Sequence, residues 1–171
     1  DFKNGFTIVV VPTDDLEIEG NYMGHCVGTY CDPVSSGRTT IYSLRDKRNQ
    51  PHVTIEVVNS SQNYEVSTVM QIKGKGNDTP VEKYRPMIRQ WLGSTNLNYQ
   101  DCRDYWDILS EEEVLSILKS PGRSSSNRML MDFARNTQND KIINLIIQML
   151  KDPGLVDGFT EEDRNKLMHP M

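Results

Sequence analysis

Residues 39 to 58 read Thr-Thr-Ile-Tyr-Ser-Leu-Arg-Asp-Lys-Arg-Asn-Gln-Pro-His-Val-Thr-Ile-Glu-Val-Val. Apolar and polar residues alternate on both sides of the polar run 46–51, which ends in proline. A period of two, interrupted by residues that favour turns, predicts strands at 39–45 and 52–58 joined as a hairpin. The rest of the predicted fold is built around this hairpin.

Two further strands are predicted beside the hairpin. Residues 6–12, Phe-Thr-Ile-Val-Val-Val-Pro, are rich in β-branched side chains and end in proline. Residues 64–73 follow the polar turn at 59–63. Together the strands predict an antiparallel meander.

The segment between the first strand and the hairpin contains a His-Cys pair set among glycines. Residues 16–19 alternate briefly with a period of two. Met23, Val27 and Tyr30 are spaced four and three apart, which predicts a short helix ended by Asp32-Pro33.

Helices are predicted after the meander. Residues 79–82, Thr-Pro-Val-Glu, have the form of a capping box before a helix that runs to about Leu92. Pro86 should bend this helix or mark its true start. Beyond Asn96 the pattern is helical only, and Ser110-Glu-Glu-Glu113 is a second capping box.

We therefore expect an α+β fold, a small antiparallel meander packed with helices and followed by an all-helical extension. The predicted domain boundaries are 1–96 and 97–171. The most apolar stretch, residues 142–150, is shorter than the roughly 20 residues of a membrane span, so no membrane contact is expected. The chain begins with Asp1, and we expect a processed or excised piece.

Charge and cysteine content limit the function classes. A net charge of −5 argues against a broad electrostatic grip on nucleic acid but leaves a local basic patch open. The 3 cysteines are an odd number and do not resemble a disulfide framework. A reducing, cytoplasmic setting in a host cell is expected, with association with a virion as the alternative.

Strand alternation predicts two different faces for the sheet. The aliphatic face, expected to be buried against helices, comprises Tyr42, Leu44, Val53, Ile55, Val57, Met70 and Ile72. The polar face comprises Arg45, His52, Thr54, Glu56, Gln71 and Lys73.

The pair His25-Cys26 suggests a thiolate nucleophile. Sequence neighbours on a helix point about 100° apart, so His52 is a better base on paper than His25. Glu56 would orient the base. The alternative is a small buried cysteine beside a hydrogen-bonded histidine.

The sequence also offers candidate residues for a metal site and for a phosphate-binding loop. Cys26, Cys31, His25 and His52 are ligand types that zinc prefers, but they lack a tight Cys-x-x-Cys spacing, and no metal or other cofactor is expected. Residues 74–77, Gly-Lys-Gly-Asn, do not form a Walker A loop. They predict a solvated glycine turn or an anion site formed with Arg45 and Lys73.

The ordered set of residues between about 16 and 92 resembles the PcfJ-like domain family. The positions that carry this resemblance are His25, Cys26, Gly28, Tyr30, Gly37, Arg45, Pro51, Thr54, Glu56, Gln71, Gly74 and Asn77. The resemblance implies a protein of a conjugative plasmid, another mobile element or a bacteriophage, and it implies no particular reaction.

Three functions follow as expectations. The first is a binding module in which Arg45 and Lys73 meet an anionic ligand such as a nucleotide or nucleic-acid end. Gln71, Asn77, Gly74 and Thr54 would complete that pocket, and His25 and Tyr30 would close it. The second is an enzyme with Cys26 as nucleophile, and the third is an assembly component of a phage particle whose polar set is a buried network. The helical half is expected to offer surface for protein partners.

Overall fold

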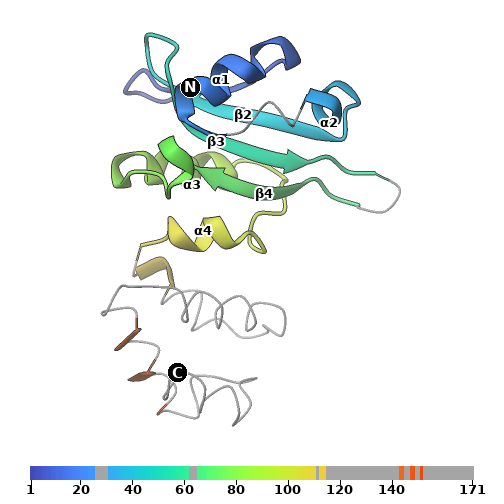
Figure 1. The fold of residues 1–171 in the computed structure, drawn as a ribbon. Helices are drawn as coiled ribbons and strands as arrows, with labels where there is room; N and C mark the ends of the chain where they lie inside the picture. Colours follow the sequence, from blue (N-terminus) through green and yellow to red (C-terminus); the bar gives the residue numbers. More distant parts are fainter. Residues whose placement is uncertain are drawn as a thin grey trace. The chain divides into compact units, whose positions relative to one another are not determined.

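The computed structural model describes residues 1–25, 31–61, 65–110, 112–114, 143–144, 147–148 and 151 (Figure 1). The chain divides into two compact units, Asp1–Ile108 and Leu109–Met171. The first unit contains the sheet and carries the candidate site.

The sheet is an antiparallel meander. Its strands are β1 (Thr7–Val10), β2 (Thr39–Arg45), β3 (Pro51–Val58) and β4 (Thr68–Lys73). They lie in the order β1-β2-β3-β4, so every neighbour in sequence is also a neighbour in the sheet. The predicted α+β class and the predicted meander are confirmed.

Short helices connect and cover the strands. The α-helices are α1 (Leu16–Met23), α2 (Cys31–Ser35), α3 (Arg85–Gly93) and α4 (Arg103–Asp107). The 3-10 helices are η1 (Thr13–Asp15), η3 (Lys75–Asn77) and η4 (Glu82–Tyr84). Within the described residues, no helix is long and apolar enough to cross a membrane.

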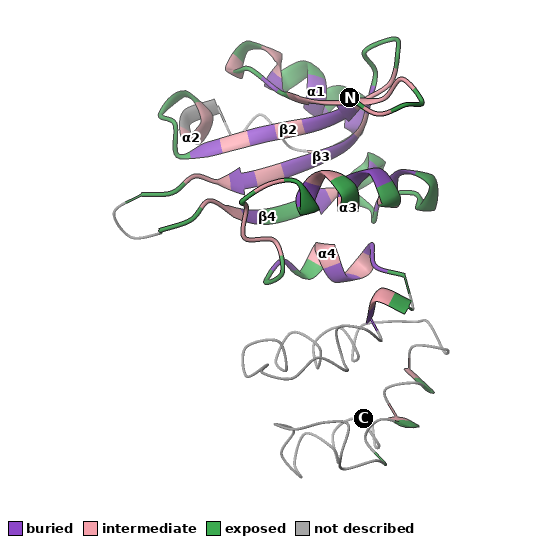
Figure 2. Ribbon diagram, turned by 180° about the vertical axis from the view of Figure 1, so that it is seen from behind, coloured by how far each residue is buried: buried purple, intermediate pink, exposed green. Residues whose placement is uncertain are grey.

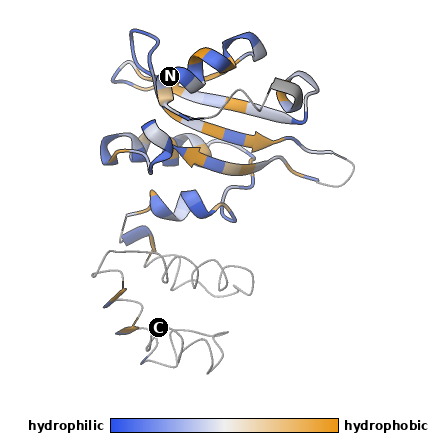
Figure 3. Ribbon diagram, in the orientation of Figure 1, coloured by the Kyte–Doolittle hydropathy of each residue, from blue (hydrophilic) through white to orange (hydrophobic). Residues whose placement is uncertain are grey.

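The aliphatic face of the sheet packs against α3. Val53, Ile55 and Ile72 share one buried cluster with Ile88 and Leu92 of α3. Figure 2 shows the buried residues along β2 and β3, in the middle of the sheet, and Figure 3 shows hydrophobic residues along β3 and β4. Each such side chain contributes about 1.5–3 kcal/mol when it leaves water, so this cluster is the main source of stability.

The opposite face of the sheet is partly covered by α1. Leu16 of α1 joins Val11 and Ile41 in a second buried cluster, against which Val34 packs. The α1 helix includes residues 16–19, where the sequence shows only a brief alternation with a period of two. The buried residues of this segment are Leu16, Glu19, Gly20 and Met23. Their spacing is helical, but the apolar stripe is hard to recognise in the sequence because it includes the carboxylate of Glu19.

Two predicted helix boundaries were wrong. Asp32-Pro33 was expected to end a helix, but both residues lie inside the first turn of α2, where proline is tolerated. Thr79-Pro80 does not start the following helix, because α3 begins at Arg85 with Pro86 in its first turn. The alternative that Pro86 marks the true start is confirmed.

Two irregularities in the strand register move residues away from their predicted faces. Leu44 pairs with Val53 but Arg45 pairs with Pro51, so the register passes over His52. A second shift, between Glu56 and Val57, passes over Met70, which is 52% exposed. The predictions that His52 lies on the polar face and that Met70 is buried were therefore wrong, since a bulge breaks strict alternation.

The residues after α3 close the outer edge of β4. The Val69 amide donates to the Asn98 carbonyl at 2.8 Å, and the Ile72 amide donates to the Asp104 carboxylate at 2.9 Å. The first compact unit accordingly extends past Asn96, to Ile108. Covering an edge in this way removes a row of groups that would otherwise pair with another chain.

In the second unit, the predicted capping box at 110–113 is confirmed. The Ser110 amide donates to the Glu113 carboxylate at 2.9 Å, and the Glu113 amide donates to the Ser110 hydroxyl at 3.2 Å. Most of the helical extension predicted for 97–171 lies outside the described residues.

Candidate functional site

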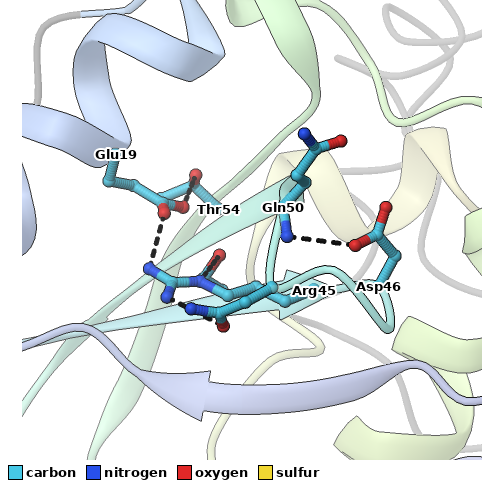
Figure 4. A network of polar contacts seen from close by, with 7 residues as sticks. Glu19, Arg45, Asp46, Gln50 and Thr54 are labelled. Atoms are coloured by element: carbon cyan, nitrogen blue, oxygen red, sulfur yellow. Dashed lines mark hydrogen bonds and ion pairs between the residues drawn. The ribbon is translucent and has the colours of Figure 1, made fainter.

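A buried carboxylate is the centre of the candidate site (Figure 4). The α1 helix places Glu19 against the polar face of the sheet, where the residue is 1% exposed. Its Oε1 accepts a hydrogen bond from the Thr54 hydroxyl at 2.8 Å, and its Oε2 accepts one from Arg45 Nη2 at 3.1 Å. A charge buried this deeply needs such partners, because an unpaired carboxylate would cost several kcal/mol.

The Arg45 guanidinium joins the sheet face to the turn between β2 and β3. Besides Glu19, it donates from Nε to the Ser43 hydroxyl at 3.3 Å and from Nη1 to Asn49 Oδ1 at 3.2 Å. Asp46 holds the same turn by accepting the backbone amide of Gln50 at 3.0 Å (Figure 4). Each nitrogen of the guanidinium therefore has a partner within the protein.

The strand register places the predicted polar residues on one face. Glu56 is directly opposite Gln71, and Thr54 is directly opposite Lys73. Directly opposed residues share a face, so the predicted common face of Thr54, Glu56, Gln71 and Lys73 is confirmed. The contacts made along this face differ, because Gln71 is exposed and Lys73 forms an ion pair with Asp104 at 2.9 Å.

His52 belongs to a different arrangement. Its Nε2 lies 2.9 Å from the Asp46 carboxylate, and its Nδ1 lies 2.9 Å from the Tyr84 hydroxyl. Its ring packs against Phe6 and Tyr84, on the side of the main buried cluster. The hydrogen bond from His52 lowers the pKa of the Asp46 carboxyl. Both ring nitrogens therefore have hydrogen-bond partners, and His52 links Asp46 in the hairpin turn to Tyr84 in η4.

His25 follows immediately after α1. Gly24 ends that helix in the left-handed conformation, with φ +69°, and the His25 amide donates to the Gly20 carbonyl at 3.1 Å. The Nε2 atom of His25 is buried and has no hydrogen-bond partner among the described residues. Burial lowers the pKa of the imidazole, and the nearby Glu19 carboxylate opposes that shift.

The end of α1 lies close to the turn after β4. A Cβ added to Gly24 would lie 3.7 Å from the Gly76 nitrogen, so the two backbones are near contact. Gly76 and Asn77 both have positive φ, at +69° and +63°. The Lys75 ammonium lies 5.1 Å from the centre of the Tyr22 ring, which is 38% exposed. Lys75, Tyr22, Gly76 and Asn77 are called the junction surface below.

A family model described as "PcfJ-like protein" matches residues 2–89, more than half of the chain. The chain belongs to the PcfJ-like protein family. The search of curated proteins and the search of solved structures found no match. The matched segment of this PcfJ-like chain runs from before β1 into α3, so it contains the Glu19 network and the junction surface.

Several predicted site residues of the PcfJ-like chain cannot be compared with this geometry. Cys26 and Tyr30, with the side chain of Cys31, lie outside the described residues. The described thiol, Cys102, is buried, and burial raises its pKa to about 11, so it is a poor nucleophile. No cluster of three metal-ligating side chains occurs within the part of the chain that the structure describes.

Sequence reasoning missed Glu19, although a signal for it was present. Leu16, Glu19, Gly20 and Met23 have the spacing of one helix face. A carboxylate on an otherwise apolar face predicts a buried partner, and the nearest candidates on the polar face were Arg45 and Thr54. The pairing of Lys75 with Tyr22 had no comparable signal, because those residues come from distant segments.

Proposed function

We propose that this chain is a phage or mobile-element protein and that its residues 1–108 form a binding module for an anionic ligand, a nucleotide or the end of a single-stranded nucleic acid. The contact between the Lys75 ammonium and the Tyr22 ring carries this proposal. An exposed aromatic ring offers a surface on which a base can stack, and an adjacent lysine attracts the phosphate.

The backbone of the junction surface supports the same interpretation. Gly76 has a left-handed backbone conformation and no Cβ. A ligand can therefore approach the backbone of this turn closely. The side chains of Gln71 and Asn77 are exposed, so their amides are available to donate to or accept from a base or a sugar. These groups come from β4 and from the turn that follows it.

Arg45 and Lys73, the two cations that the sequence suggested for binding the anion, do not contact the ligand in this proposal. Arg45 pairs with Glu19, and Lys73 pairs with Asp104, so an internal carboxylate offsets each charge. Arg45 and Thr54 then hold α1 against the sheet and thereby position Tyr22. Within the described part of the chain, Lys75 forms no ion pair with a carboxylate, and we assign the phosphate contact to it.

Fluorescence anisotropy of a labelled single-stranded oligonucleotide, with nucleoside monophosphates as competitors, tests the proposal on the full chain. We expect Lys75→Ala to weaken binding at least about fivefold and to reduce the salt dependence by roughly one phosphate contact. Tyr22→Ala should weaken binding by a similar factor, whereas Tyr22→Phe should retain it because the ring is kept.

Arg38→Ala is the matched control, because Arg38 is an exposed cation before β2, at the opposite end of the sheet from Lys75. Equal losses in Arg38→Ala and Lys75→Ala would show a non-specific charge effect and contradict the proposal. Absence of binding by the folded wild-type chain would also contradict it. That outcome would favour the assembly role, in which the Glu19–Arg45–Thr54 set is a buried network.

A cysteine-nucleophile enzyme is the second candidate, and the state of His25 favours it. Burial lowers the pKa of this imidazole, so it is neutral at pH 7 and its Nε2 atom lacks a partner in the described residues. An activated Cys26 should react with iodoacetamide at pH 7 much faster than Cys102, whose thiol is buried with a pKa of about 11. Equal, slow alkylation of both thiols in the native chain would exclude this candidate.

A further inference from the structure

His25 lies where a second proton on its ring would be poorly accommodated. Its Nε2 atom is buried, and the described residues offer it no acceptor. Protonation turns both ring nitrogens into donors and adds a positive charge. A buried charge without a partner is costly, so the charged ring needs access to water.

The charged groups around His25 do not remove this difficulty. Glu19, on α1, attracts the imidazolium, but Thr54 already donates to Oε1 and Arg45 to Oε2. On the side of the β4 turn, Lys75 carries a positive charge and Lys73 is paired with Asp104. The charge of the Glu19 carboxylate is therefore largely neutralised by Arg45.

The contacts that hold Gly24 and His25, just beyond the last residue of α1, are small. Gly24 and Gly76 lie so close that a Cβ added to Gly24 would be at ordinary van der Waals distance from the Gly76 backbone, and a single amide hydrogen bond ties His25 back to Gly20. Met23, the last residue of α1, is fully buried, so the low-cost opening is confined to Gly24 and His25 beyond it, which bury no large apolar side chain.

We propose that protonation of His25 unseats Gly24 and His25, the segment that follows α1, from the Gly74–Asn77 turn, making this junction a switch that opens in mild acid. The direction follows from linkage. The closed form has the lower pKa and the open form the ordinary value of 6.5, so the open form binds the proton more tightly. Opening becomes more favourable as pH falls below 6.5 and levels off below the pKa of the closed form.

Amide hydrogen exchange followed by NMR on the full chain, between pH 8 and pH 5, tests the switch. After correction for intrinsic rates, the opening constant at the Gly24 and His25 amides should rise by up to about tenfold per pH unit over the transition. Its midpoint should coincide with the titration of the His25 ring protons. No ligand is needed, so the result is independent of the proposed binding function.

Two variants decide the origin of the effect. His25→Gln keeps a neutral polar side chain and should abolish the transition, while His169→Gln should leave it unchanged. Thermal unfolding at pH 8 establishes that both variants are folded. If His25→Gln does not fold, the ring titration and amide exchange of the wild-type chain still decide. Constant protection of the Gly24 amide through the His25 titration, or an unchanged transition in a folded His25→Gln variant, would overturn the proposal.

Discussion

Arg45 on β2 donates a hydrogen bond to the buried carboxylate of Glu19 on α1 over 3.1 Å, across 26 positions of the sequence. This pair lies beneath α1 on the polar face of the sheet, and Thr54 completes the coordination of the carboxylate. It therefore fixes the helix that carries Tyr22 and that is followed by Gly24 and His25. The following predictions test this pair and the contacts around it.

Glu19→Ala should destabilise the chain by about 3–5 kcal/mol, because it leaves the largely buried Arg45 charge without its partner. Urea unfolding followed by circular dichroism measures the change. Glu17→Ala is the matched control, since Glu17 is an exposed carboxylate on the same helix and should change stability by at most about 0.5 kcal/mol. Similar effects for the two variants would refute a structural role for the Glu19 pair.

Thr54→Val should cost about 1–3 kcal/mol, because the substitution removes the hydroxyl that donates to Glu19 and leaves a buried acceptor unsatisfied. Thr54→Ser keeps the hydroxyl and should lose only about 1 kcal/mol from the missing methyl group. The free energies of unfolding of the two variants provide the comparison. A serine variant as unstable as the valine variant would argue that packing, and not the hydrogen bond, matters at this position.

Gly74→Ala should destabilise the turn after β4. An added Cβ would lie 3.1 Å from the Pro80 Cα and 3.3 Å from the Thr79 carbonyl oxygen, and such backbone atoms cannot move aside cheaply. A cost of about 1–3 kcal/mol is expected from this overpacking. Gly93→Ala, at the end of α3, has no atom within 4 Å of the added Cβ and should be neutral or slightly stabilising. Thermal unfolding of both variants checks the contrast.

Asp46 should contribute to the acid sensitivity of the chain. The hydrogen bond from His52 lowers the pKa of Asp46 below its ordinary 3.8, so the folded state holds this proton less tightly than the unfolded state. The contribution is present above pH 3.8 and disappears as pH falls through the folded-state pKa. Asp46→Asn should therefore show a shallower loss of stability in that range, as measured by urea unfolding from pH 5 to pH 2. If the unfolding free energy of Asp46→Asn depended on pH as steeply as that of the wild-type chain, the Asp46–His52 hydrogen bond would not stabilise the folded chain.

Much of the sheet could be predicted because local patterns specify it. The alternation at 39–45 and 52–58, with a polar turn between them, requires only that one face of each strand be buried. The observed strands, Thr39–Arg45 and Pro51–Val58, differ from this prediction by one residue. The common face of Thr54, Glu56, Gln71 and Lys73 followed from the same periodicity.

The failures occur where a long-range contact outweighs the local pattern. His52 and Met70 do not lie on the faces predicted for them, because register shifts in β3 and β4 change which residues oppose each other. The first half of α1, residues 16–19, was seen only as a brief period-two alternation because Glu19 occupies a buried position that its charge disfavours in isolation. Only the partners Arg45 and Thr54, which come from later strands, make that position favourable.

The sequence by itself therefore determined the meander, the class of the fold and the polar residues that the strands contribute to the candidate site, but not Glu19 at its centre. Strand periodicity and turn composition are local properties, so one amino-acid sequence is enough to reveal them. The tertiary structure alone decided which partner each of those polar residues has. It paired Arg45 with Glu19 and Lys73 with Asp104, and it brought Lys75 over Tyr22, since such contacts depend on the packing of segments that are far apart along the chain.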